Sequence, residues 1–245
     1  MRQAVDINAD LGEGVANETQ LLPYISSCSI ACGGHYGDHE SMRATIRLAK
    51  RHGVKVGAHP SFPDRDNFGR KLMTLTKEAL SRTVFEQVLA FMAACELEAV
   101  DLHHVKLHGA LYNYAAADAA TADAVVAALE KLKVRCYLYC PHGSVLHEKA
   151  KNLFPLKFEG FIDRPYHANG LLVSRSQEGA VIDDPQTAWR QLFEMLKHHR
   201  VETVEGDPLN IVADTFCIHG DHPNSLLLLE YIDRQMKLNN FKLDR

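Results

Sequence analysis

In residues 102–113, with the sequence L-H-H-V-K-L-H-G-A-L-Y-N, three of the ionisable side chains form a pattern that could do chemistry. In a strand over 102–107, alternation puts His104 and Lys106 on one face, and His108 continues that row into the turn at Gly109. Burying such a row is costly unless it lines a solvated site. A single member would more often be a buried group paired with a carboxylate, but three in register at the end of a strand favour a functional site.

A second polar row lies near the start of the chain. The sequence V-D-I-N-A-D-L over 5–11 alternates, so Asp6, Asn8 and Asp10 share one face of the predicted strand. Glu13 follows between two glycines, in a turn that could bring backbone N–H groups and a carboxylate near a ligand. The turn alone could equally be a capping cluster, but the three-residue row favours function.

Two histidines and an arginine follow the next strand candidates. His35 comes after the small, apolar residues 27–32, and His59 precedes a proline at the end of the strand predicted over 54–58. The proline fixes the local backbone and so orients the imidazole, although a histidine bonded to a nearby carbonyl is an equal alternative. Arg70 lies in the loop that follows.

Charged pairs end the last two strand candidates. Asp163 and Arg164 follow the strand predicted over 158–162, and His219 and Asp221 follow the final strand. Opposite charges at a strand end can bind a zwitterion or bind one another. If the strands are parallel, their carboxyl ends meet, and all of these polar groups converge on one opening.

The elements that must position these residues alternate between strand and helix. The predicted strands are 5–11, 27–32, 54–58, 102–107, 134–140, 158–162 and 215–218. The predicted helices include 39–52, 76–95, 115–132 and 184–198. Residues 170–182 look like a hairpin over the opening, and 201–212 hold two further short strands. No G-x-G-x-x-G follows the first strand, so we expect an α/β fold: one domain over 1–245, a parallel, TIM-like (β/α) barrel of about seven strands rather than a Rossmann sheet.

Composition narrows the class of partner. The 245 residues are 46% hydrophobic, enough for a full core, and 27 basic against 31 acidic residues give a net charge of -4, without a basic stripe for nucleic acid. No signal peptide or membrane helix is evident, so we expect a cytoplasmic protein with a small-molecule substrate. The six cysteines form no C-x-x-C pair.

With these residues assembled, the chain resembles the LamB/YcsF family over nearly its full length. The resemblance rests on ordered blocks: D-I-N-A-D-L-G-E-G, A-C-G-G-H-Y-G-D, G-A-H-P-S-F-P-D, F-G-R, H-V-K-L-H-G-A-L-Y-N, F-I-D-R-P-Y and C-I-H-G-D. The family commonly has Phe at Gly34, Gly at Ser61 and Pro at Leu107. These departures adjoin ionisable residues rather than replace them.

The resemblance implies the A subunit of bacterial ATP-dependent 5-oxoprolinase, with ATP as co-substrate and two further subunits as partners. It implies opening of the 5-oxo-L-proline lactam to L-glutamate. The chain has no G-x-x-x-x-G-K-[ST] motif, so the binding site for the ATP phosphates must come from another fold or another subunit. In our hypothesis Arg70 or Arg164 binds the substrate carboxylate, Lys106 stabilises oxyanion charge, and an acid or a histidine acts as base. The expected catalytic residues are Asp10, Glu13, His59, Lys106 and His108. The expected substrate-binding residues are Asp6, Asn8, His35, Arg70, His104, Asp163, Arg164, His219 and Asp221.

Two alternatives remain open. The barrel is also similar to that of carbohydrate deacetylases, where an Asp and two His hold a divalent cation, and here Asp10, His35 and His59 could form that set. The second Asp of their N-A-D-D pattern is replaced by Leu11, so a metal is not predicted as required. Alternatively, the chain is a non-catalytic substrate-binding subunit of a larger complex.

Overall fold

A computed structural model describes residues 2–175 and 177–245 and contains a closed barrel of seven parallel strands, which confirms the predicted fold class. Neighbours around the barrel follow the order β10-β2-β3-β4-β5-β6-β7. The barrel strands are β2 (Ile7–Leu11), β3 (Ser27–Ala31), β4 (Lys55–His59), β5 (Leu102–Lys106), β6 (Tyr137–Cys140), β7 (Leu156–Phe161) and β10 (Thr215–Ile218). Every pairing is parallel, so all seven carboxyl ends open on one side.

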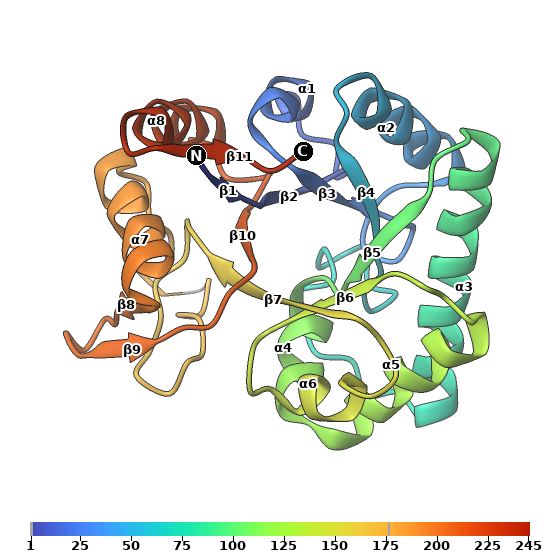
Figure 1. Cartoon of the computed structure of the whole chain (residues 1–245). Helices are drawn as coiled ribbons and strands as arrows, with labels where there is room; N and C mark the ends of the chain where they lie inside the picture. The colour runs from blue at the N-terminus through green and yellow to red at the C-terminus, as the bar shows by residue number, and fades with distance from the viewer. Residues whose placement is uncertain (1, 176) are drawn as a thin grey trace.

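Helices surround the strands and cover their outer, apolar faces (Figure 1). They are α1 (Glu18–Leu21), the 3-10 turn η1 (Leu22–Tyr24), α2 (His39–Arg51), α3 (Lys77–Leu97), α4 (Gly109–Ala117), α5 (Ala119–Leu132), α6 (Val145–Ala150), α7 (Pro185–His198) and α8 (Ser225–Leu238). Side-chain caps start several of them; the Asp38 carboxylate accepts from the N–H groups of Glu40 and Ser41 at the start of α2. No helix in the described part of the chain is long and apolar enough to span a membrane.

Three predicted elements differ in the structure. The first strand is split at Asp6: β1 (Gln3–Val5) pairs with β11 (Phe241–Leu243) outside the barrel, and only β2 joins it. The long helix over 115–132 is two helices, because Asp118 ends α4 and its carboxylate caps the first turn of α5.

The hairpin expected over 170–182 is not a pair of strands. Within its described residues the structure has a single bridge, from Leu172 to Tyr166, and the rest is loop and turn. The two short strands expected within 201–212 are present as the antiparallel pair β8 (Arg200–Glu202) and β9 (Pro208–Asn210).

The barrel interior is polar, as the alternating rows predicted. Asn8, His104 and Lys106 are each at most 2% exposed and point inward, whereas Val105 and Ile7 on the alternate positions join the surrounding core. Buried polar groups are costly unless they pair with one another. The pairing of these groups therefore decides which of them support the barrel and which reach its opening.

Candidate active site at the carboxyl ends of the barrel strands

A cavity of about 680 Å³ opens at the carboxyl ends of the strands. Its lining includes seven of the predicted site residues: Asp10, His59, Arg70, Lys106, His108, Arg164 and His219. Tyr112, Phe161 and Arg175 complete its polar and aromatic wall. Side chains from the ends of β2, β4, β5 and β10 thus meet at one opening, as the parallel topology requires.

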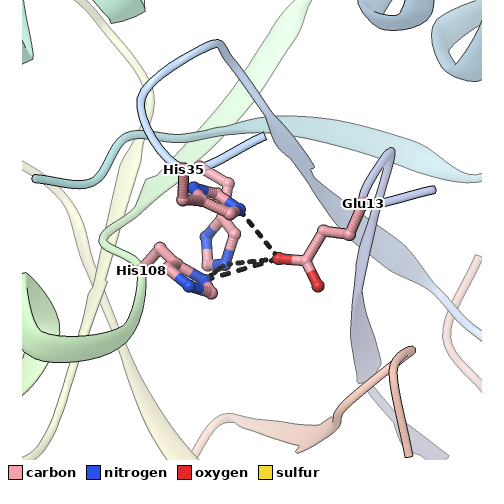
Figure 2. A group of neighbouring side chains, drawn as sticks. Glu13, His35 and His108 are labelled. Atoms are coloured by element: carbon pink, nitrogen blue, oxygen red, sulfur yellow. Dashed lines mark hydrogen bonds and ion pairs between the residues drawn. The ribbon is translucent and has the colours of Figure 1, made fainter. Parts of the chain in front are cut away.

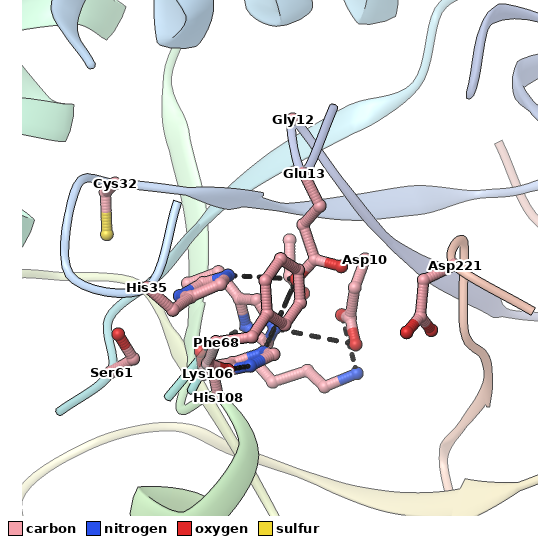
Figure 3. Close-up of polar contacts among 12 residues, drawn as sticks. Asp10, Gly12, Glu13, Cys32, His35, Ser61, Phe68, Lys106, His108 and Asp221 are labelled. Atoms are coloured by element: carbon pink, nitrogen blue, oxygen red, sulfur yellow. Dashed lines mark hydrogen bonds and ion pairs between the residues drawn. The ribbon is translucent and has the colours of Figure 1, made fainter. Parts of the chain in front are cut away.

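Lys106 lines this cavity and is 2% exposed. Its ammonium lies against the Asp10 carboxylate (Figure 3). Its Nζ is 2.8 Å from Asp10 Oδ1, 2.9 Å from Glu159 Oε1 and 3.2 Å from Asn8 Oδ1. Burial by itself lowers the pKa of Lys106, but the two carboxylates outweigh it, and the pKa lies well above its usual value. The site therefore holds a fixed positive charge at neutral pH.

Asp10 is the charged partner of Lys106. Burial by itself raises the pKa of Asp10, but attraction to His59 and Lys106 prevails and holds that pKa well below its usual value. Asp10 Oδ2 also lies 3.5 Å from His59 Nε2. An ionised carboxylate beside a cation can accept a hydrogen bond from a substrate N–H or from water.

Four residues beside this pair form what we call the His/Glu cluster: Glu13, His35, His59 and His108. Glu13 Oε1 is 2.9 Å from His35 Nε2, 3.4 Å from His108 Nδ1 and 3.8 Å from His59 Nε2. The His35 and His108 rings stack with centroids 3.7 Å apart, and both face the Glu13 carboxylate (Figure 2). All four donor atoms lie within 4.8 Å of one another, so this buried cluster could hold a metal ion.

Burial keeps the His35 and His108 imidazoles uncharged. Desolvation, with repulsion from His59, lowers the pKa of His35 to about 2 and moves the pKa of His108 well below its usual value. Desolvation also raises the pKa of Glu13 well above its usual value, and the nearby Asp10 adds to that effect. Neutral imidazole is the form that binds metal ions.

Two further carboxylates at the rim, Asp163 and Asp221, have basic partners. His219 donates its backbone N–H to Asp163 over 2.9 Å, and its Nδ1 lies 3.0 Å from the same carboxylate. Asp221 pairs with Arg70 and, at 3.1 Å, with Arg175. Both arginine side chains are about one-third exposed or more, so they can reach an anion in the cavity.

Three of the predicted substrate-binding residues are held by contacts within the protein. Arg164 donates to the carbonyl oxygens of Val173 and Ala180 and so holds that loop. His104 bonds Ser29 Oγ and stacks on Tyr139, inside the barrel. Asp6 precedes β2 and pairs with Lys157 and Thr215 at the opposite end of the barrel. A row along a strand spans several layers, and only its last members reach the opening.

The structure also adds residues that the sequence patterns did not single out. Glu159 is buried against Lys106, and Arg175 shares Asp221 with Arg70. Alternation in L-K-F-E-G-F over 156–161 places Lys157 and Glu159 on the inner face, a signal that could have identified Glu159.

Two of the expected metal donors, His35 and His59, belong to the His/Glu cluster, together with Glu13 and His108. Asp10 lies outside that cluster: its carboxylate contacts Lys106, and it forms a second candidate group with Cys217 and His219.

Solved structures similar to this chain include one of substantial sequence identity and others that share only the fold. A lactam utilization protein from Thermus thermophilus has 36% sequence identity and a TM-score of 0.91 over 98% of this chain and 99% of its own. The catalytic domain of a peptidoglycan N-acetylglucosamine deacetylase from Eubacterium rectale shares the fold at 9% identity and a TM-score of 0.52, over 99% and 88% of the two chains. An uncharacterized protein from Agrobacterium tumefaciens shares the fold at 11% identity and a TM-score of 0.57, over 98% of this chain and 86% of its own. The LamB/YcsF family model matches residues 5–245, and the chain belongs to the LamB/YcsF family.

Proposed function

We propose that this chain is the subunit of an ATP-dependent 5-oxoprolinase that binds 5-oxo-L-proline and opens its lactam ring to L-glutamate. The observation that carries the proposal is the charged Lys106 in the lining of the cavity, held against the Asp10 carboxylate. Family membership and the 36% identity to a lactam utilization protein support the substrate class.

The cavity offers a complementary group for each polar part of the substrate. The ammonium of Lys106 is placed to stabilise negative charge on the lactam carbonyl oxygen. Asp10, ionised beside it, is placed to accept the ring N–H or to orient water. Arg70 and Arg175 at the rim offer guanidinium groups for the substrate carboxylate.

Coupling to ATP follows from the chemistry of the amide. A five-membered lactam is stabilised by resonance, and transfer of a phosphoryl group from ATP to its carbonyl oxygen makes the ring carbon electrophilic and releases ADP. Water then adds to that carbon, the C–N bond breaks as the nitrogen gains a proton, and a second water releases phosphate and leaves the new carboxylate. The chain lacks a P-loop motif, so we assign ATP binding to the complex with two further subunits.

The experiment is glutamate and ADP release by the reconstituted complex with 5-oxoproline. Lys106→Ala and Asp10→Asn should each lower kcat by about 100-fold or more, the usual effect of removing a transition-state charge or a proton-transfer group. Lys149→Ala, which removes an exposed lysine paired with Asp123, is the matched control and should leave turnover unchanged. Near-normal rates in both site variants would refute the assignment.

A second candidate, a metal-dependent amide hydrolase that needs no ATP, is favoured by the His/Glu cluster. When bound, a divalent metal would polarise an amide carbonyl or activate water. The cluster would hold it, while Lys106 and Asp10 orient the amide. Amide hydrolysis without ATP that stops after chelation would favour this candidate over the first.

A further inference from the structure

The His/Glu cluster contains a hydrogen-bonding conflict. His59 Nδ1 is 2.8 Å from the carbonyl oxygen of Lys106, and His108 Nε2 is 2.9 Å from the carbonyl oxygen of Phe68. A carbonyl oxygen only accepts hydrogen bonds, so each of these nitrogens carries the ring proton. The other nitrogens, His59 Nε2 and His108 Nδ1, then carry lone pairs in the neutral rings, yet they lie 3.0 Å apart.

Among the remaining members, His35 directs its one N–H at Glu13, so no histidine donates to these two lone pairs. One oxygen of Glu13 lies within 3.8 Å of both lone pairs and 2.9 Å from His35 Nε2. His35 Nε2 donates to the Glu13 carboxylate, whereas His35 Nδ1 is buried without a hydrogen-bond partner among the described residues, so the ring proton can move to Nδ1 and free Nε2 for a metal ion. Two nitrogen lone pairs and a carboxylate that face one another in a buried site repel, and a cation bound between them would remove that repulsion.

We propose that Glu13, His35, His59 and His108 bind one divalent transition-metal ion of the zinc type. Three imidazole nitrogens and one carboxylate oxygen suit zinc and its neighbours, whereas magnesium and calcium prefer oxygen ligands. The carbonyls that hold His59 and His108 act as the outer partners that fix the tautomer of metal-binding histidines. The proposal does not depend on the lactam reaction, because it concerns metal binding by the four residues and not turnover of 5-oxoproline.

The charge balance of the site explains why Asp10 is not a ligand. The Lys106 ammonium lies between Asp10 and Glu159, so both carboxylates already have a cation. Glu13 has no lysine or arginine within ion-pair distance in the described part of the chain: the contacts of its carboxylate are with the three histidines. The cavity therefore provides two separate cation positions, one occupied by Lys106 and the other framed by the cluster.

The test measures metal binding by the full chain after chelation and dialysis. Titration with ZnCl₂ should show one tight site per chain by calorimetry and by elemental analysis, and MgCl₂ should not compete for it. CoCl₂ should give visible absorption bands, because cobalt bound by nitrogen and oxygen ligands at low coordination absorbs strongly. Glu13→Gln and His108→Gln should each weaken Zn²⁺ binding by at least about 10- to 100-fold.

The matched control is His198→Gln, which removes an exposed histidine on α7 and should leave Zn²⁺ affinity unchanged. Equal Zn²⁺ affinity in wild type and both cluster variants would overturn the proposal, since the ion would then occupy other histidines. If the cluster variants do not fold, the wild-type titrations decide: no tight Zn²⁺ site and no cobalt bands would mean that a proton shared by His59 and His108 relieves the conflict. Absence of lactam turnover in the wild-type complex, with normal Zn²⁺ binding by the wild-type chain, would count against the proposed function alone.

Discussion

The substitution Lys106→Met should destabilise the barrel strongly, because it removes the cation from between two buried carboxylates. Asp10 and Glu159 are 4% exposed each, and Lys106 Nζ lies 2.8 and 2.9 Å from them. Methionine has a similar length, so the main loss is charge. Removing one partner of a buried ion pair costs about 3–5 kcal/mol, and here two carboxylates lose the same partner.

Urea unfolding followed by circular dichroism measures this loss. The free energy of unfolding should fall by at least about 3 kcal/mol, which for a chain of this size lowers the melting temperature by roughly 6–12 °C. Adding Glu159→Gln to Lys106→Met should restore part of the stability, because one uncompensated charge is removed.

A matched lysine separates charge from packing. Lys149→Met removes an exposed cation and should change stability by less than about 1 kcal/mol. A Lys106→Met variant with wild-type stability, or a double variant destabilised by the sum of its single substitutions, would refute the ion-pair reasoning.

Three further predictions test other parts of the site. Burial alone raises the pKa of Asp163, but attraction and hydrogen bonds from His219 lower it to about 2. The ionised carboxylate therefore adds about 2 kcal/mol of stability, which is complete above about pH 4 and lost as pH falls toward 2. Asp163→Asn should remove this pH dependence of the free energy of unfolding in urea, and an unchanged loss of stability at acid pH would contradict the prediction. Gly57→Ala should cost about 1–3 kcal/mol, because the new Cβ would overlap the His104 ring, and a variant that melts like wild type would show that the ring can move freely. If the proposed function holds, Arg175→Ala should raise the KM of the complex for 5-oxoproline by about tenfold or more with little change in kcat. Steady-state kinetics measure both constants, and an unchanged KM would exclude a role of Arg175 in carboxylate binding.

Local patterns in the chain were enough to predict the barrel. Alternation with period two identified the strands and the inward face of His104 and Lys106, and glycines marked the turns. The number of strands followed, because parallel strands need crossover helices and the helical spacing between them was clear. The split at Asp118 was missed because a helix cap and a helix interior differ by one hydrogen bond that the spacing of apolar residues does not reveal.

The partners within the site were decided by the tertiary structure alone. Lys106 and Asp10 are 96 positions apart, and Glu159 reaches Lys106 from another strand. Closure of the barrel also decides how far each side chain lies from the opening. His104 stays inside the barrel, whereas His108 lies beside Glu13.

The amino-acid sequence by itself thus determined which side chains face the inside of the barrel, since that depends on residues two positions apart. Only the folded chain decided which carboxylate neutralises Lys106 and which one joins the histidines. The physical reason is that a buried charge takes the nearest opposite charge in space, and spatial distance across a closed barrel depends on strand order and register rather than on position along the chain.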